Sequence, residues 1–193
     1  MLVRTIFLPA IVLSLLTLWT PHSLSGQNPA GHKIQVNVKL TQDRVHDSSH
    51  IFAILGIAIQ NGWHINSAHP SDESMIPTIV EPSPVKGISV SGIHYPTGEQ
   101  VKFPYMDKPA DVYSGSVSVV LNLWIEPGTR PGRYSLPVDI TYQACNDNIC
   151  VAPATLRVEV PFRVVPSNDP ASPFNNELYD TFVKEFWKRR KVQ

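Results

Sequence analysis

The sequence has only two cysteines among its 193 residues, and its formal net charge is zero. Basic and acidic side chains number 16 each. The sequence therefore does not support a nucleic-acid partner. It lacks a phosphate-binding loop, a Ser/His/Asp hydrolase signature, a paired-carboxylate motif and internal repeats, so nothing in it indicates a cofactor. These absences leave the two cysteines as the candidate nucleophiles.

Histidines are present, but their spacing is not that of a metal site. After the first 26 residues they are His32, His46, His50, His64, His69 and His94. His64 and His69 could meet across a loop, yet this spacing is not one of the common zinc-binding patterns. We therefore predict no metal site.

Long apolar runs are confined to the start of the chain. Arg4 supplies a positive charge, Ile6–Trp19 is mostly apolar, and the small residues Ser25 and Gly26 follow. This pattern predicts that residues 1–26 are a secretory signal peptide. The alternative is a retained membrane anchor, but the run is shorter than the roughly 20 residues that a span needs. Export would place the protein in the periplasm or outside the cell, where disulfides persist unless something reduces them.

Long helices are not indicated before residue 168, because 18 prolines are spread along the chain. Several segments instead alternate apolar and polar residues with the period of a strand. These segments are 32–40, 117–125, 136–144 and 156–164, and the segment 51–59 is almost continuously apolar. With Pro/Gly turns between seven or eight such strands, the pattern predicts one all-β domain over residues 27–168, an antiparallel β-sandwich.

The segment 169–193 has a different pattern. Phe174, Leu178, Phe182 and Phe186 recur every four residues. This spacing predicts an amphipathic helix. Pro173 is expected to be its first residue, with Ser172 as its cap. The apolar stripe could dock on the sandwich itself, on a partner or on a membrane; membrane contact is not favoured.

Cys145 and Cys150 lie on either side of a predicted turn. Three of the four residues between them are Asn146, Asp147 and Asn148, which suit tight turns. The alternating segments before and after predict a β-hairpin. Facing residues in an antiparallel pair have Cα atoms about 4.5–5.5 Å apart, and a disulfide tolerates about 4.4–6.8 Å. The two thiols can therefore close on each other.

The spacing of the two cysteines leaves the role of such a bridge open. In the chain-entropy model, so short a loop yields roughly 2 kcal/mol, compared with about 4.7 for a 100-residue loop. The bridge would thus stabilise the folded state only weakly. It could be either structural or redox-active. No Lys, Arg or His lies between Ala144 and Thr155. The local sequence therefore gives no reason for an activated thiolate.

Three motifs resemble a known family. Tyr142–Cys145 with Cys150 and Pro153 is similar to the active-site hairpin of the amino-terminal periplasmic domain of the thiol:disulfide interchange protein DsbD. The other two matches are Asn61–Ser67, followed by Ile76–Thr78, and Val112–Gly115. They occur in the family's order within residues 32–165, although some members have five residues between the cysteines. The resemblance implies an immunoglobulin-like fold.

The resemblance also implies roles for particular residues. Cys145 and Cys150 would be the catalytic pair, with Cys150 forming mixed disulfides with partners and Cys145 resolving them. Tyr113 would cover the disulfide until a partner displaces it, and Tyr142 and Asp111 would support the site. The alternative for Tyr113 is a residue that merely starts the next strand.

The activity implied is that of a thiol–disulfide oxidoreductase that relays electrons. Its expected partners are a thioredoxin-like or membrane-embedded thiol reductase, acting in trans, and an exported disulfide-containing protein. The alternative is a non-catalytic β-sandwich that binds a partner and keeps the hairpin disulfide as a local brace.

Overall fold

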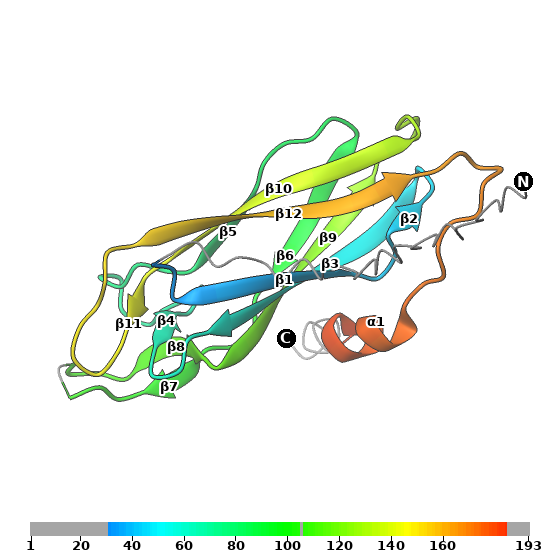
Figure 1. Cartoon of the computed structure of the whole chain (residues 1–193). Helices are drawn as coiled ribbons and strands as arrows, with labels where there is room; N and C mark the ends of the chain where they lie inside the picture. Colours follow the sequence, from blue (N-terminus) through cyan, green and yellow to red (C-terminus); the bar gives the residue numbers. More distant parts are fainter. Residues whose placement is uncertain (1–30, 105, 185–193) are drawn as a thin grey trace, which may run out of the picture.

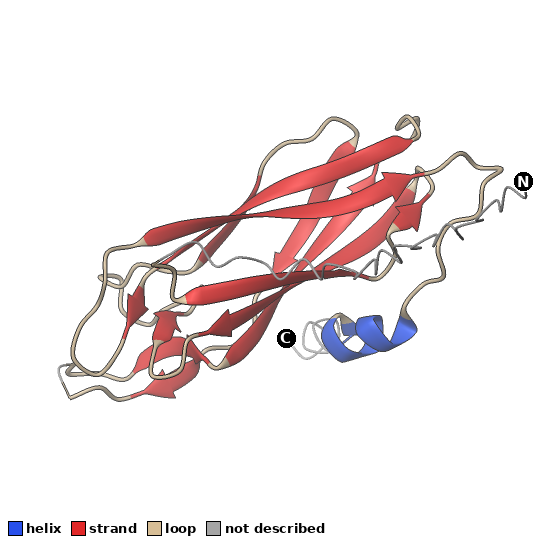
Figure 2. Ribbon diagram, viewed as in Figure 1, coloured by secondary structure: helices blue, strands red, loops and turns tan. Residues whose placement is uncertain are grey.

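The computed structural model describes residues 31–104 and 106–184. The predicted signal peptide, residues 1–26, and Phe186 of the predicted helical stripe lie outside the described residues. Antiparallel strands dominate the described chain, as predicted (Figure 2). The strands are β1 (Ile34–Leu40), β2 (Arg44–Val45), β3 (Ser49–Ile59), β4 (His64–Asn66), β5 (Ile79–Pro82), β6 (Ile88–His94), β7 (Glu99–Val101), β8 (Ala110–Ser114), β9 (Ser116–Ile125), β10 (Gly132–Tyr142), β11 (Ala144–Cys145) and β12 (Ala154–Val164).

Two four-stranded sheets form the two layers of the sandwich (Figure 1). One has the order β1-β3-β9-β6, and the other has the order β2-β12-β10-β5. Their pairs are antiparallel except for the two-residue contact between β12 and β2. The predicted immunoglobulin-like antiparallel β-sandwich with a C-terminal helix is thus confirmed.

The core lies between these two sheets and is filled by alternate residues of the long strands. In β9, Val119, Leu121 and Leu123 are fully buried. In β10, Leu136 and Val138 are buried in the same cluster. Side chains of a strand alternate between its two faces, so the period-two pattern of the sequence supplies one apolar face to each layer.

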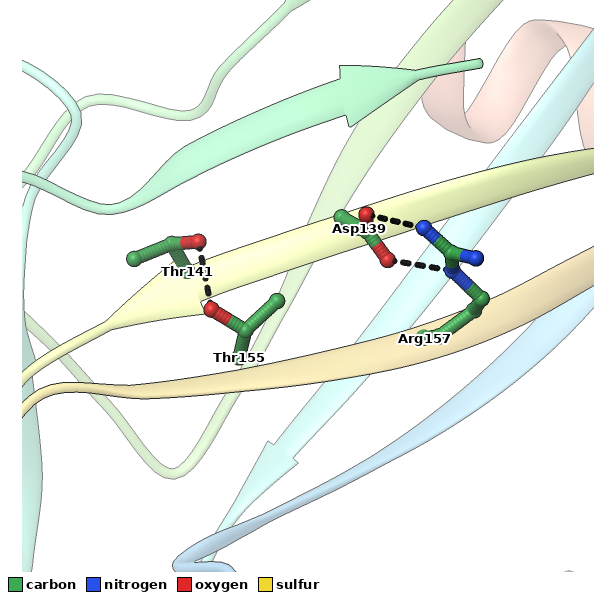
Figure 3. Close-up of polar contacts among 4 residues, drawn as sticks. All are labelled: Asp139, Thr141, Thr155 and Arg157. Atoms are coloured by element: carbon green, nitrogen blue, oxygen red, sulfur yellow. Dashed lines mark hydrogen bonds and ion pairs between the residues drawn. The ribbon is translucent and has the colours of Figure 1, made fainter.

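The hairpin of β10 and β12 carries the chain to the two cysteines, and its outer face fixes its register. Arg157 pairs with Asp139 through two nitrogen–oxygen contacts of 2.7 and 2.5 Å, and the Thr141 and Thr155 hydroxyls are 2.9 Å apart (Figure 3). Both pairs are direct cross-strand neighbours. Such pairs contribute modestly, about 0.2–1 kcal/mol each, but they oppose a register slip that would displace the turn.

A third, smaller sheet forms one end of the molecule and has the order β11-β4-β8-β7. The turn between β11 and β12 lies at this same end (Figure 1). Within the small sheet, the interior strand β4 pairs with β11 on one side and β8 on the other. This sheet therefore places two segments that are distant in sequence, residues 64–66 and 110–114, beside the strand that contains Cys145.

The C-terminal helix α1 (Asn176–Phe182) begins later than predicted. Asn175 is the cap, and its side-chain oxygen accepts a hydrogen bond from the Leu178 N–H at 2.9 Å. The Ser172 hydroxyl instead accepts bonds from the backbone N–H groups of Asp43 and Arg44. The prediction of Ser172 as cap and Pro173 as first helical residue was wrong, because Ser172 is held by Asp43 and Arg44 at the start of β2.

The helix packs on the outer face of its own sandwich. Leu178 and Val183 form a cluster with Phe52 and Ile54 of β3 and with Val120 of β9. The Phe52 and Tyr179 rings meet edge to face with centroids 5.4 Å apart. This cover explains why the segment 51–59 is almost continuously apolar: β3 faces the core on one side and α1 on the other.

Removing residues 170–193 is expected to lower the melting temperature. Large apolar side chains gain about 1.5–3 kcal/mol each on full burial. Losing Leu178 and Val183 should therefore cost on the order of 3 kcal/mol, or roughly 6–12 °C for a chain of this size. Calorimetry of the truncated and full proteins measures the effect.

A matched pair of point variants serves as the control. Leu178→Ser should reproduce part of the loss, whereas Thr181→Ser, on the exposed side of the same helix, should not. An unchanged melting temperature in the truncated protein would instead point to a partner or membrane surface as the docking site.

In the part of the chain that the structure describes, no helix is both long and apolar enough to cross a membrane.

Candidate thiol–disulfide site

The site begins where β10 ends, at Tyr142. This side chain is buried, and its hydroxyl accepts a hydrogen bond from the Lys33 N–H at 3.2 Å and bonds to the His32 ring at 3.0 Å. Burial raises the pKa of Tyr142 above its ordinary value of 10.0. Tyr142 is two residues before β11. Its hydroxyl thus links the end of β10, and the start of the cysteine turn, to the residues just before β1.

The turn between the cysteines is built by Asn146. Its side-chain oxygen accepts hydrogen bonds from the N–H groups of Asn148 and Ile149, both at 2.9 Å. Its own N–H donates to the Ile149 carbonyl, also at 2.9 Å. The predicted tight turn of Asn and Asp residues therefore forms, and a side chain that mimics backbone bonding closes it.

Cys145 and Cys150 are joined by a disulfide, with Cα atoms 4.0 Å apart. The two ends of the bridge differ in exposure. Cys145 is 3% exposed, whereas Cys150 is an exposed residue. Its neighbour Ile149 is 57% exposed. Because exchange requires a thiolate to reach a disulfide sulfur, an approaching thiolate finds the Cys150 end of the bridge open and the Cys145 end covered.

His64 lies directly opposite Cys145 in the pairing of β4 with β11. Its side chain is buried, and its ring stacks on the Phe103 ring with centroids 4.3 Å apart. Loss of hydration lowers the pKa of His64 below its ordinary value of 6.5, and the negative charge of Asp147 in the turn partly opposes this. The imidazole beside Cys145 is therefore neutral at pH 7.

Tyr113 of β8 precedes Ser114, the residue that pairs with His64, and its side chain lies on the other face of the small sheet. It pairs with Ile65, which in turn pairs with Ala144. Consecutive residues of a strand point to opposite faces, so the Tyr113 ring faces away from Cys145. It is 2% exposed within the core cluster. The structure thus places Tyr113 inside a strand, as in the alternative interpretation, and does not bring its ring to the sulfurs.

The hydroxyl of Tyr113 is also engaged elsewhere. It accepts a hydrogen bond from the Ala68 N–H at 3.1 Å and donates to the Pro96 carbonyl at 3.0 Å. Burial raises its pKa above the ordinary value of 10.0. A covering role would require β8 to leave its place beside β4, and the role of Tyr113 as a cap stays a prediction.

Asp111 anchors a loop. None of its hydrogen bonds goes to Cys145 or Cys150. Its carboxylate accepts hydrogen bonds from the N–H and the hydroxyl of Ser71, and its carbonyl accepts one from the Ser67 N–H. It lies at the end of β8 away from Ser114, the residue that pairs with His64. Asp111 therefore supports the loop after β4.

A comparison of the sequence with protein families identifies the family of this domain. Residues 32–161 match the family described as "Thiol:disulfide interchange protein DsbD, N-terminal". The chain belongs to this family. A comparison with curated proteins found no relative.

Two of the solved structures that match this chain are N-terminal domains. The N-terminal periplasmic domain of ScsB from Proteus mirabilis matches with a TM-score of 0.53 and 14% identity, over 80% of this chain and 55% of that chain. The DsbD n-terminal domain of Neisseria meningitidis in the reduced form matches with a TM-score of 0.39 and 14% identity, over 66% of this chain and 90% of that chain. This chain thus spans about half the length of the ScsB domain chain that it matches.

Sequence reasoning missed two residues of this DsbD N-terminal domain, His64 and Phe103. The sequence places His64 in the Asn61–Ser67 motif and five residues from His69, but it gives His64 no role beside the cysteines. Among the described residues, no group of three or more His, Cys, Asp or Glu could hold a metal. Its place beside Cys145 depends on the pairing of β4 with β11. Phe103 comes from a loop in which no pattern marks it.

Proposed function

We propose that the protein is a periplasmic thiol–disulfide exchange domain that relays electrons through Cys145 and Cys150. The observation that carries the proposal is the asymmetric bridge. The Cys150 end of the disulfide is exposed at the turn, and the Cys145 end is buried in β11. Exchange needs one sulfur that a partner can reach and a second that resolves the mixed disulfide.

The exchange divides into two balanced steps. In the reduced domain, the Cys150 thiolate attacks a partner disulfide; a Cys150–partner sulfur bond forms, and one partner sulfur leaves as a thiolate. The Cys145 sulfur then attacks Cys150, loses its proton, and displaces the second partner sulfur. The domain is oxidised by two electrons and the partner disulfide is reduced by two. A reductase with two thiols restores the reduced domain by the same steps in reverse.

The turn offers a contact surface for such partners. Ile149 precedes Cys150 and is 57% exposed. A large apolar side chain beside a reactive sulfur is a suitable anchor for a partner that must bring its own sulfur to Cys150. Asp147 adds one negative charge in the same turn.

The proposed partners are a thioredoxin-like or membrane-embedded thiol reductase as electron donor and an exported disulfide-containing protein as acceptor. The proposed organisation is a signal peptide over residues 1–26, the exchange domain over 27–168 and the helical segment over 169–193. The family match over residues 32–161 supports the exchange domain, and the periplasmic location named for the ScsB domain supports the proposed periplasmic location.

One observation favours a second candidate function, a binding sandwich with a structural bridge. Cys145 is 3% exposed and is part of β11, so the disulfide also braces a strand of the small sheet. Such a brace would be expected to resist reduction.

The reduction potential of the pair decides between the two candidates. Structural disulfides in secreted proteins typically lie below about −300 mV. We expect a value above that limit, measured by equilibration with dithiothreitol or glutathione buffers and alkylation of the free thiols. A value below it would favour the brace.

A further inference from the structure

His64 is the titratable side chain placed directly against Cys145 by the pairing of β4 with β11. Residues that face each other in an antiparallel pair have Cβ atoms about 4.5–5.5 Å apart and point to the same face. The imidazole and the Cys145 sulfur therefore share one face of the small sheet. The proposed relay gives His64 no role.

The surroundings of His64 hold the ring in place. The ring is stacked on Phe103, whose side chain is 5% exposed in a cluster with Ala110 and Val112. Flanked by β11 and β8 and covered by Phe103, the ring has little freedom to turn away from Cys145. No hydrogen bond of the His64 side chain with another described residue competes for it.

The charged and titratable groups around the ring come from each packed element. The turn after β11 contributes Asp147, whose charge acts on His64. On β8 the paired residue is Ser114, whose hydroxyl donates to Glu99 of β7 at 3.0 Å. Cys145 itself is the remaining titratable group once the bridge is reduced. Burial outweighs the carboxylate of Asp147, so the ring is neutral and has a nitrogen that can accept a proton.

We propose that His64 is the proton acceptor for the Cys145 thiol in the resolving step. The inference rests on the proposed function. In this step the Cys145 S–H bond breaks and its proton moves to the imidazole. The Cys145 sulfur forms the bond to Cys150, and the bond between Cys150 and the partner sulfur breaks. The partner leaves as a thiolate and is reduced, while the cysteine pair is oxidised. In the reverse direction, protonated His64 returns the proton to Cys145 as it leaves.

A buried resolving thiol needs such a group. Burial in apolar surroundings raises the pKa of a thiol, and the thiol form is a poor nucleophile. The segment around the cysteines contains no basic side chain, and water reaches Cys145 poorly. A neutral imidazole on the neighbouring strand supplies the base that the hairpin itself lacks.

The test follows the reaction of the reduced protein with 5,5′-dithiobis(2-nitrobenzoate), which releases one thionitrobenzoate when Cys150 attacks and a second when Cys145 resolves. Cys145→Ser assigns the phases, because it should retain only the first. In the wild type, the second phase should be nearly independent of pH between about 7 and 8, since the lowered pKa of His64 leaves its base mostly neutral there. In His64→Gln the second phase should be slower by about tenfold or more at pH 7. It should also rise about tenfold per pH unit, because only the thiolate then reacts.

His69→Gln is the matched control, because it makes the same change five residues along, at an exposed ring that packs on Tyr95. Both phases should be unchanged in it. Unaltered second-phase rate and pH dependence in His64→Gln would overturn the role of His64 and leave the relay intact. Absence of both phases in the wild type would instead contradict the proposed relay itself.

A measurement on the wild type keeps the inference testable if His64→Gln does not fold. The His64 ring resonances are followed by NMR against pH in the oxidised and reduced proteins. In the reduced protein they should show a second inflection from the titration of Cys145, because adjacent groups titrate as a coupled pair. The oxidised protein should lack the inflection that comes from Cys145. Identical curves in the two states would overturn the inference.

Discussion

Cys145→Ser is expected to accumulate a stable mixed disulfide between Cys150 and a partner protein, whereas Cys150→Ser should accumulate almost none. The physical reason is access. Cys150 is exposed at the turn and Cys145 is 3% exposed, so a partner sulfur reaches Cys150 first. Without Cys145 the mixed disulfide has no resolving thiol. Non-reducing gels of a periplasmic extract, with mass spectrometry of the adduct, measure the yield.

The same two variants control for folding. The bridge closes a short loop, so its loss should cost only roughly 2 kcal/mol in either variant. Urea unfolding should therefore give similar stabilities for Cys145→Ser and Cys150→Ser. If Cys145 proved to be the better trapping residue at equal stability, the assignment of roles would be reversed.

Tyr113→Ala is expected to destabilise the protein by about 3–5 kcal/mol, the usual cost of removing a large aromatic ring from a core. The ring is 2% exposed, and its hydroxyl bonds to Ala68 and Pro96. Tyr113→Phe keeps the ring and loses only these bonds, at a cost of about 1 kcal/mol. The midpoints of urea unfolding for the three proteins measure both effects. A loss below about 1 kcal/mol in Tyr113→Ala would contradict the core position.

The same variants test the predicted cap. If the ring shields the sulfurs, reduced Tyr113→Ala should react faster than Tyr113→Phe with a small disulfide, under conditions where both are folded. The predicted cap requires the faster reaction, although the register places the ring on the face opposite Cys145. Equal rates would contradict the cap. A faster reaction of Tyr113→Ala would mean that β8 rearranges and that Tyr113 covers the bridge.

The local features of the site follow from the sequence. Alternating apolar residues predicted the strands that became β9, β10 and β12, because period two supplies one core face to a sheet. Asn146 and its neighbours predicted the turn, since such side chains bond to the backbone within a few residues of themselves. The distance between facing residues then made the Cys145–Cys150 bridge predictable. Each of these depends on residues close together in the chain.

The tertiary structure alone decided what surrounds the bridge. His64 is 81 positions before Cys145, and only the pairing of β4 with β11 makes them neighbours. A shift of one residue in a strand register moves every side chain to the other face. No sequence pattern sets this register for strands as short as β4 and β11. The register seen in the structure places His64 opposite Cys145 and turns Tyr113 toward the core. The start of α1 after Asn175 instead of Ser172 likewise involves distant segments, because the Ser172 hydroxyl accepts hydrogen bonds from the N–H groups of Asp43 and Arg44.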